Sequence, residues 1–338
     1  MSTLLFALNA VLPILLLIGL GYFLKKVSFI NENFLSVGNK FVFTVALPTL
    51  LFYTTYTIDD MSLFKPGVIV FAVCGILFLF IFGLVISKLF IKNPLQKGVI
   101  VQGIFRANYA IIGIPLAEAL GGAQAVAVVA IISVFVVPLM NVLAVIALVM
   151  YVKPAEGVHP MKSLVKQILL NPLIIATVLG LISFGIQSMM PRDVLTGEYL
   201  YSMEKNINFL YTSIKWIAQI ASPLALVILG GTFEFFVIKE MKREISIGVF
   251  SRVVLAPLIT LSIAVFLSTY TTFFSFSRYD YPALIALYAA PSAVASAIMA
   301  KQMNNDASLA VQLVVWSTSL SIISVFFVVL VFKILGIL

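Results

Sequence analysis

The residues with the clearest chemistry lie in one apolar stretch, FRANYAIIGIP, at positions 105–115. Arg106 is its only charged residue, and Asn108, Gly113 and Pro115 lie on the same stretch. A cation near the centre of a bilayer costs about 2.5–3.5 kcal/mol on insertion scales and usually faces a polar cavity. The guanidinium of Arg106 can hold a carboxylate through two hydrogen bonds. A helix broken by Gly and Pro beside such a charge is typical of a transporter binding site, so the stretch predicts a site for an anion.

A second break is predicted in a later apolar run, at Pro291 of the stretch AAPSAVASA. Proline lacks an N–H, and the residue before it avoids helical conformation. The segments 112–115 and 289–291 should therefore unwind and expose backbone polar groups, which membranes tolerate only where protein or water lines a cavity. Helices that begin after each break would point their positive dipole ends into that cavity, which also favours an anion.

Each of these residues also has a simpler structural interpretation. Arg106 could snorkel to the cytoplasmic surface or bind helix carbonyls, and Asn108 could join two helices. Single prolines in membrane helices are often ordinary kinks. Arg252 follows Glu244 by eight residues, near the predicted cytoplasmic end of its run, and is expected to snorkel. His159 lies alone in a loop and is expected to be solvated.

The composition places these residues in a membrane. Hydrophobic residues make up 62% of the 338 residues and charged residues 10%, with a mean hydropathy of +1.16, far beyond a soluble domain. The net charge of +8 comes from Lys and Arg between apolar runs, which is typical of membrane topology, so no nucleic-acid partner is expected. The single cysteine, Cys74, excludes a disulfide framework and a cysteine-based metal site. The sequence offers no nucleophile–base arrangement and no Walker motif, so we expect no enzyme, no ATP-driven pump and no cofactor.

Ten apolar runs are long enough to cross a bilayer. They lie near residues 4–24, 35–54, 67–88, 97–120, 123–151, 167–190, 208–233, 245–268, 281–302 and 307–336. The odd-numbered loops between them carry twelve Lys and Arg, whereas the even-numbered loops and the tail carry five. The positive-inside rule therefore predicts a multi-pass protein of the cell membrane with cytoplasmic odd loops and both termini outside.

The prolines indicate an internal repeat. Pro48 in the second run aligns with Pro223 in the seventh at an offset of 175 residues, and Pro115 aligns with Pro291 at an offset of 176. Fourteen prolines can also align by coincidence. Paired breaks in two halves are nevertheless typical of transporters built from inverted repeats.

The domain prediction follows from the span count. Each half holds five spans, an odd number, so the second half must enter the membrane inverted. The sequence thus predicts an all-α polytopic membrane protein of ten transmembrane helices. Its first five-helix repeat covers residues 1–152, a cytoplasmic linker covers 153–166, and the second, inverted repeat covers 167–338.

Several motifs resemble the auxin efflux carrier family, whose members include plant PIN exporters and bacterial malate or malonate permeases. They are FRANYAIIGIPLAEALGG, the pair VALPTLLF and SPLALVILGG, and AAPSAVASAIMAKQMNNDASLA. The resemblance spans essentially the whole chain and implies crossed, broken helices 4 and 9. It also implies a scaffold of helices 1, 2, 6 and 7, often a dimer contact, and an elevator-type transport domain of helices 3–5 and 8–10. The short linker is nearer to a bacterial-type organic acid carrier than to the plant members.

These observations predict a secondary transporter of a small organic carboxylate; the alternative is an anion channel or facilitator without coupled alternating access. Expected partners are the carboxylate, the lipid bilayer and a second copy bound through the scaffold helices. Coupling to H⁺ or Na⁺ stays open, because the apolar runs hold almost no acidic residue. The expected substrate-binding residues are Arg106, Asn108, Tyr109, Gly113, Pro115, Ala290, Pro291, Ser292, Pro48 and Pro223.

Overall fold

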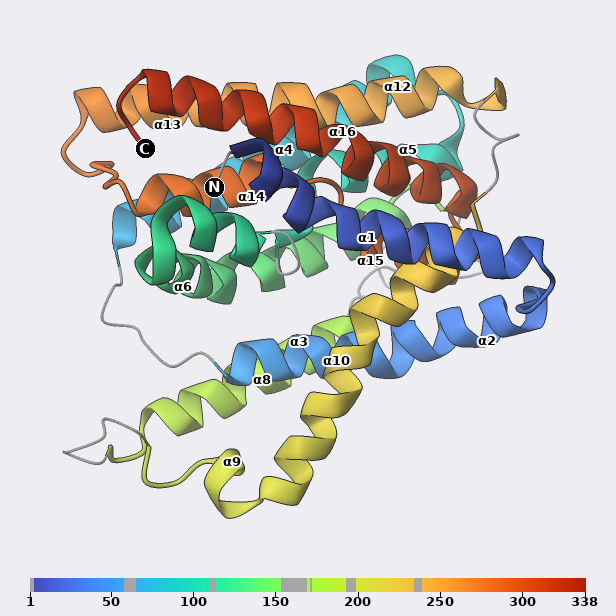
Figure 1. Cartoon of the computed structure of the whole chain (residues 1–338), viewed down its shortest axis with the longest axis horizontal. Coiled ribbons are helices and arrows are strands. Elements are labelled where there is room, and N and C mark those ends of the chain that lie inside the picture. The colour runs from blue at the N-terminus through green and yellow to red at the C-terminus, as the bar shows by residue number, and fades with distance from the viewer. Residues whose placement is uncertain are drawn as a thin grey trace.

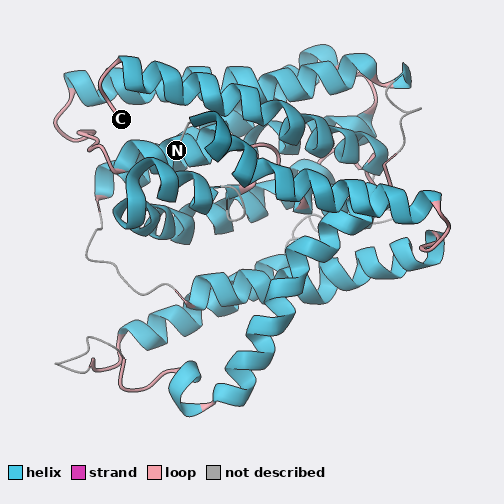
Figure 2. Ribbon diagram, in the orientation of Figure 1, coloured by secondary structure: helices cyan, strands magenta, loops and turns pink. Residues whose placement is uncertain are grey.

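The computed structural model describes residues 3–57, 65–109, 113–152, 169–170, 172–192, 199–233 and 239–338. The whole predicted linker at 153–166, including His159, lies outside these ranges, and so do its predicted properties. The described residues form helices and loops, without a β-strand among them (Figure 2). The predicted all-α class is therefore confirmed for this part of the chain.

The first half of the chain contributes seven described elements, one of them a short π-helix, η1. They are α1 (Thr3–Lys26), α2 (Glu32–Phe41), η1 (Val42–Ala46), α3 (Leu47–Tyr56), α4 (Pro66–Phe90), α5 (Pro94–Phe105) and α6 (Ile114–Val149). The second half includes another π-helix, η3. Its elements are α8 (Pro172–Ser188), α9 (Met203–Asn206), α10 (Asn208–Gly231), α12 (Lys242–Phe250), η3 (Ser251–Leu255), α13 (Ala256–Tyr270), α14 (Asp280–Ala289), α15 (Ala295–Gln302) and α16 (Ala307–Ile334).

Prolines and side-chain caps set where several helices begin. Helices α4, α5 and α8 start with a proline, whose missing N–H is harmless in a first turn. The side chain of Asn93 accepts a hydrogen bond of 3.0 Å from the N–H of Leu95 at the start of α5. Asp306 accepts one of 2.9 Å from the N–H of Leu309 at the start of α16. Both bonds satisfy donors that a helix N-terminus otherwise leaves unpaired.

Six helices in the described part are long and apolar enough to cross a membrane. They are 32–53, 66–90, 124–149, 208–231, 242–270 and 307–334. The shorter α8 is also apolar. These helices agree with a polytopic membrane protein, whereas the full count of ten spans and the inverted repeat stay predictions.

The helices pack as two groups. The frame group consists of α1, α2, η1, α3, α8 and α10, in which α1 packs on α10, and α3 packs on both α8 and α10. The crossover group consists of α4, α5, α6, α12, η3, α13, α14, α15 and α16. Figure 1 shows α13 and α16 along one face of the molecule and α3, α8 and α10 along the opposite one. The groups meet where α15 contacts η1 and α10, where α6 contacts α8, and where α1 contacts α16.

Within the frame group, α1 and α10 approach each other at two glycines. Gly21 of α1 lies against the backbone of Val227, and Gly230 of α10 lies against the backbone of Ile18. A Cβ atom at either glycine would overlap a carbonyl oxygen of the partner helix. Small residues allow this backbone-to-backbone packing, which is common between helices in membranes.

Two helical runs are interrupted, as the sequence predicts. Helix α5 ends at Phe105, and Arg106 is extended with φ −87° and ψ 97°. Helix α14 ends at Ala289, and Ala290 is extended with φ −63° and ψ 149°. The predicted position of the first break, 112–115, is wrong in part, because the described non-helical residues are 106–108 and Pro115 lies in the first turn of α6. A proline in a first turn begins a helix instead of interrupting one.

Candidate functional site

The two breaks cross and pair with each other through their backbones. The N–H of Asn108 donates a hydrogen bond of 2.8 Å to the carbonyl of Pro291, and the N–H of Ala293 donates one of 3.0 Å to the carbonyl of Arg106. Ala107 and Ser292 form an antiparallel bridge between these bonds. The pairing satisfies backbone groups that the missing helical turns would leave unpaired in a membrane.

Ser292 links the crossing to two neighbouring helices, to one through its side chain and to the other through its backbone. Its hydroxyl donates a hydrogen bond of 2.8 Å to the carbonyl of Gly103 in α5. Its backbone N–H donates one of 3.1 Å to the hydroxyl of Ser317 in α16. Ser292 therefore holds the crossing together from the side of α16.

Arg252 of η3 binds the crossing from inside the protein. The expectation that its side chain snorkels to the membrane surface is wrong. The side chain is fully buried. Its guanidinium donates to the carbonyls of Ala290 (2.8 Å from Nε), Ile104 (2.9 Å) and Leu287 (3.1 Å). These carbonyls lie at the C-terminal ends of α5 and α14, where helices leave acceptors unpaired and carry partial negative charge. The two interruptions thus create the acceptors that keep this cation inside the protein.

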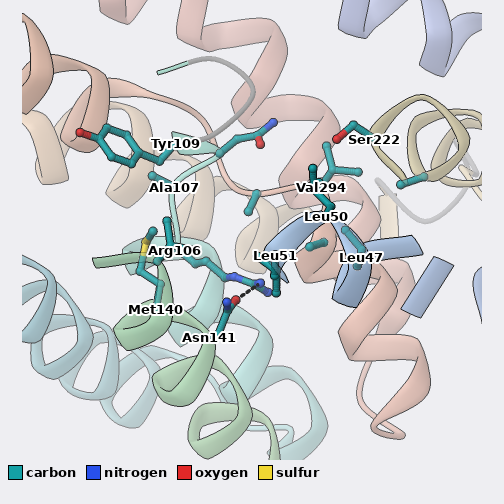
Figure 3. Close-up of a pocket in the computed structure, with 15 residues that line it drawn as sticks. Leu47, Leu50, Leu51, Arg106, Ala107, Tyr109, Met140, Asn141, Ser222 and Val294 are labelled. Atoms are coloured by element: carbon teal, nitrogen blue, oxygen red, sulfur yellow. Dashed lines mark hydrogen bonds between the residues drawn. The ribbon is translucent and has the colours of Figure 1, made fainter. Parts of the chain in front are cut away.

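Arg106 projects from the same crossing towards a cavity (Figure 3). Its side chain is only 5% exposed. One terminal nitrogen donates a hydrogen bond of 2.7 Å to Oδ1 of Asn141, and the other contacts the sulfur of Met299 at 2.6 Å. A thioether is a weak acceptor, so Asn141 provides the one strong partner shown for this guanidinium.

The cavity has a volume of about 80 Å³ and lies between the two groups of helices. The frame group contributes an apolar wall of Leu47, Leu50 and Leu51 from α3 and Ala225 from α10, with the hydroxyl residue Ser222 beside it. The crossover group contributes most of the polar groups, which come from Arg106, Asn108 and Asn141. It also contributes residues 293–295, where α15 begins. The positive dipole end of α15 therefore borders the cavity.

Hydrogen-bond donors in this cavity exceed their partners. The Nδ2 atoms of Asn108 and Asn141 are buried without a hydrogen-bond partner. Arg106 is the one charged residue among the described residues of the lining, and it forms no ion pair within the described part of the chain. A buried donor without a partner costs about 1–3 kcal/mol. An anion that accepts from these groups would remove that cost, so the arrangement suits an anion.

The predicted site residues divide into two sets. Arg106, Asn108 and Tyr109 line the cavity, although the ring of Tyr109 is directed away from Arg106 and its hydroxyl lies 3.5 Å from the carbonyl of Ala283 (Figure 3). Ala290, Pro291 and Ser292 instead hold the crossing through the bonds given above, and the residues that follow them reach the cavity.

The remaining predicted residues lie beside the site. Gly113 packs against the ring of Tyr109, which a Cβ at this position would overlap. Pro48 and Pro223 do not line the cavity, whereas their chain neighbours Leu47 and Ser222 do. The repeat therefore marked turns of α3 and α10 that border the cavity, while the two prolines themselves lie outside its lining.

Sequence reasoning missed Asn141. This amide lies on α6, three residues after Pro138, in an otherwise apolar run. A lone carboxamide beside a proline at membrane depth is a usable signal, because polar residues there usually face other helices or a cavity.

Comparisons with known proteins identify a membrane transport family. A family model described as "Membrane transport protein" matches residues 6–329. A comparison with curated proteins found no match.

Proposed function

The chain belongs to this membrane transport protein family, the family of the auxin efflux carriers, and from that premise we propose that it is a secondary transporter of a small carboxylate. Family membership establishes a membrane transporter. The carboxylate substrate, the movement of the crossover group and the orientation in the membrane are our proposal.

The observation that carries the substrate class is the unpaired charge of Arg106 beside two free amide donors. A guanidinium binds a carboxylate through charge-assisted hydrogen bonds, about twice as strong as neutral ones. Asn108 and Asn141 would donate to the remaining carboxylate lone pairs through the Nδ2 atoms that have no partner. The leucine wall from α3 would then face the carbon skeleton of the substrate.

The size of the cavity favours a small acid. A volume of about 80 Å³ is several times the roughly 10–15 Å³ that a cavity needs to hold one water. Such a space is closer in scale to an acid of three or four carbons, such as malonate or malate, than to a larger acid. An indole acid is considerably larger and would need the cavity to widen.

The lining also supports an elevator-type movement. Arg106, Asn108 and Asn141 all belong to the crossover group, whereas the frame group offers an almost entirely apolar surface. A bound anion would therefore stay with the crossover group as it moves, because its hydrogen-bond donors move with it. The frame group then corresponds to the scaffold, through which two copies would pair.

The crossing supports the inverted repeat and the ten-span count. The antiparallel bridge between Ala107 and Ser292 means that the two broken segments run in opposite directions, as inverted halves require. In this proposal α5 with the start of α6 forms the fourth span, and α14 with α15 forms the ninth. Gly122, with φ 65°, separates the fourth span from the fifth within α6. Both termini would lie on the outer side of the cell membrane.

The proposal is tested by counterflow in proteoliposomes loaded with unlabelled malonate. We expect saturable, trans-stimulated uptake of labelled malonate that malate inhibits and an indole acid inhibits much less. Sodium and pH are varied to define the coupling. Conductive flux without trans-stimulation would instead favour the channel or facilitator. If no small carboxylate exchanges or raises the melting temperature, the proposed substrate class is wrong.

A further inference from the structure

A second cavity, of about 290 Å³, lies in the same seam between the frame and crossover groups. It is lined by residues of α2, α10 and α15 and by the neighbouring ends of α1 and α16. The polar residues on which the inference rests are Lys25, Asn39 and Lys301.

Three segments place the second cavity directly beyond the first. Ala225 of α10 lines the first cavity, and Thr232, the residue directly after α10, lines the second. Along α3, η1 and α2, Leu47 lines the first cavity and Asn39 lines the second. On α15, residue 295 lines the first cavity and residue 301 lines the second. Separations of six to eight residues correspond to roughly 9–12 Å at about 1.5 Å per residue, so the three segments agree on one short path.

The second cavity also carries positive charge and an unpaired donor. Lys25 forms an ion pair with Glu32, which also lines the cavity. Lys301 has no ion-pair partner within the described part of the chain, which leaves one net positive charge in the lining. Asn39 is only 2% exposed, and its Nδ2 has no hydrogen-bond partner. A charge and a buried donor that face one polar cavity point to an anion.

We propose that the second cavity is a waiting site for the transported carboxylate, between the crossing and the side of the membrane where α1 ends. The inference rests on the proposed function. Lys301 belongs to the crossover group and Asn39 to the frame group, so the site is complete only while the two residues face each other. It would hold the anion before entry to, or after release from, the Arg106 cavity.

The first test measures the charge of the cavity without any transported anion. Thr232→Cys on a Cys74→Ser background is labelled with an anionic sulfonate and with a cationic trimethylammonium methanethiosulfonate. Removing Lys301 as Lys301→Gln should slow the anionic reagent about threefold and speed the cationic one about threefold, as expected for one charge at about 6 Å in water. Lys26→Gln is the matched control, because Lys26 is exposed and is not part of this lining.

The second test separates the waiting site from the crossing. In an Arg106→Gln background, millimolar malonate should still slow anionic labelling of Thr232→Cys, and Lys301→Gln should abolish this protection. In counterflow, Lys301→Gln should raise the KM for malonate about three- to tenfold while calorimetric affinity at the Arg106 site is retained.

The outcomes distinguish the two proposals. Equal effects of Lys301→Gln and Lys26→Gln, or no labelling of Thr232→Cys by either reagent, would overturn the waiting site and leave the proposed function standing. If the wild-type protein exchanges no carboxylate but the labelling ratio still depends on Lys301, the substrate proposal fails and the second cavity remains an anion site. The labelling test therefore decides the inference in either case.

Discussion

The backbone N–H of Asn108 donates a hydrogen bond of 2.8 Å to the carbonyl of Pro291, although the two residues come from opposite halves of the chain. The reciprocal bond from Ala293 to Arg106 lies close by. Each broken segment thus supplies the acceptor that the other needs, and neither can re-form a helix without leaving a polar group unpaired. A displacement of one break must therefore displace the other.

Neutral replacement of Arg106 should abolish tight carboxylate binding. Loss of a charge-assisted hydrogen bond is worth about 1.5–3 kcal/mol, so Arg106→Gln should weaken malonate binding about ten- to a hundredfold in calorimetry. Arg106→Lys should restore only part of the affinity, because a point charge cannot reproduce the planar fork. A folded Gln variant with wild-type affinity would remove the anion site from this cavity.

Asn141→Asp should weaken carboxylate binding in the Arg106 cavity. The new carboxylate would occupy the position of an oxygen that lies 2.7 Å from the guanidinium of Arg106 and would act as a built-in substitute for the substrate. We expect at least about tenfold weaker malonate binding with an unchanged or higher melting temperature, because the buried charge gains a partner. Asn141→Ala is the control and should have a smaller effect. Stronger binding in the Asp variant would contradict this role.

The other buried arginine should behave differently. Arg252→Gln leaves C-terminal carbonyls of α5 and α14 without their donor, and a buried acceptor left unpaired costs about 1–3 kcal/mol of stability. The melting temperature in detergent should fall sharply, whereas Arg106→Gln should change it little. Arg252→Lys should recover part of the loss. Equal melting temperatures for the two Gln variants would contradict the division of roles.

The two crossing prolines should differ in importance. Pro291 lies in the break, and replacing it with Ala allows Ala290 to become helical, so Pro291→Ala should lose transport while the protein remains folded. Pro115 lies in the first turn of α6, where Ala is almost equally acceptable, so Pro115→Ala should retain most of the transport rate. Counterflow rates normalised to protein content provide the measurement. Identical kinetics in Pro291→Ala would show that the proline is an ordinary kink.

Sidedness can be measured with single cysteines on a Cys74→Ser background. Tyr201→Cys, at an exposed position between α9 and the end of α8, should react with an impermeant maleimide from outside the cell. Lys92→Cys, at an exposed position between α4 and α5, should react only after permeabilisation. The opposite pattern would invert the proposed topology.

Local sequence signals were enough to predict two interrupted helices, the break at Pro291 and a cavity beside Arg106, but they placed the first break several residues too late. A charge and a proline are rare and costly at membrane depth, so few arrangements accommodate them. The burial of Arg252 and the contact of Asn141 with Arg106 depend on helices that are distant in sequence. Whether a cation near a helix end snorkels or turns inwards depends on which carbonyls the packing of η3 places beside it, and hydropathy does not contain that information.

The close approach of α1 and α10 at Gly21 and Gly230 limits which residues can replace these two glycines. Any larger residue at either position would push α1 and α10 apart, because a carbonyl oxygen already occupies the space. The leucines of α3 are under a different constraint, since part of their surface faces a cavity and not a backbone carbonyl. During divergence of related chains, the range of acceptable substrates can therefore change through the α3 wall, while the contact that joins α1 to α10 remains intact.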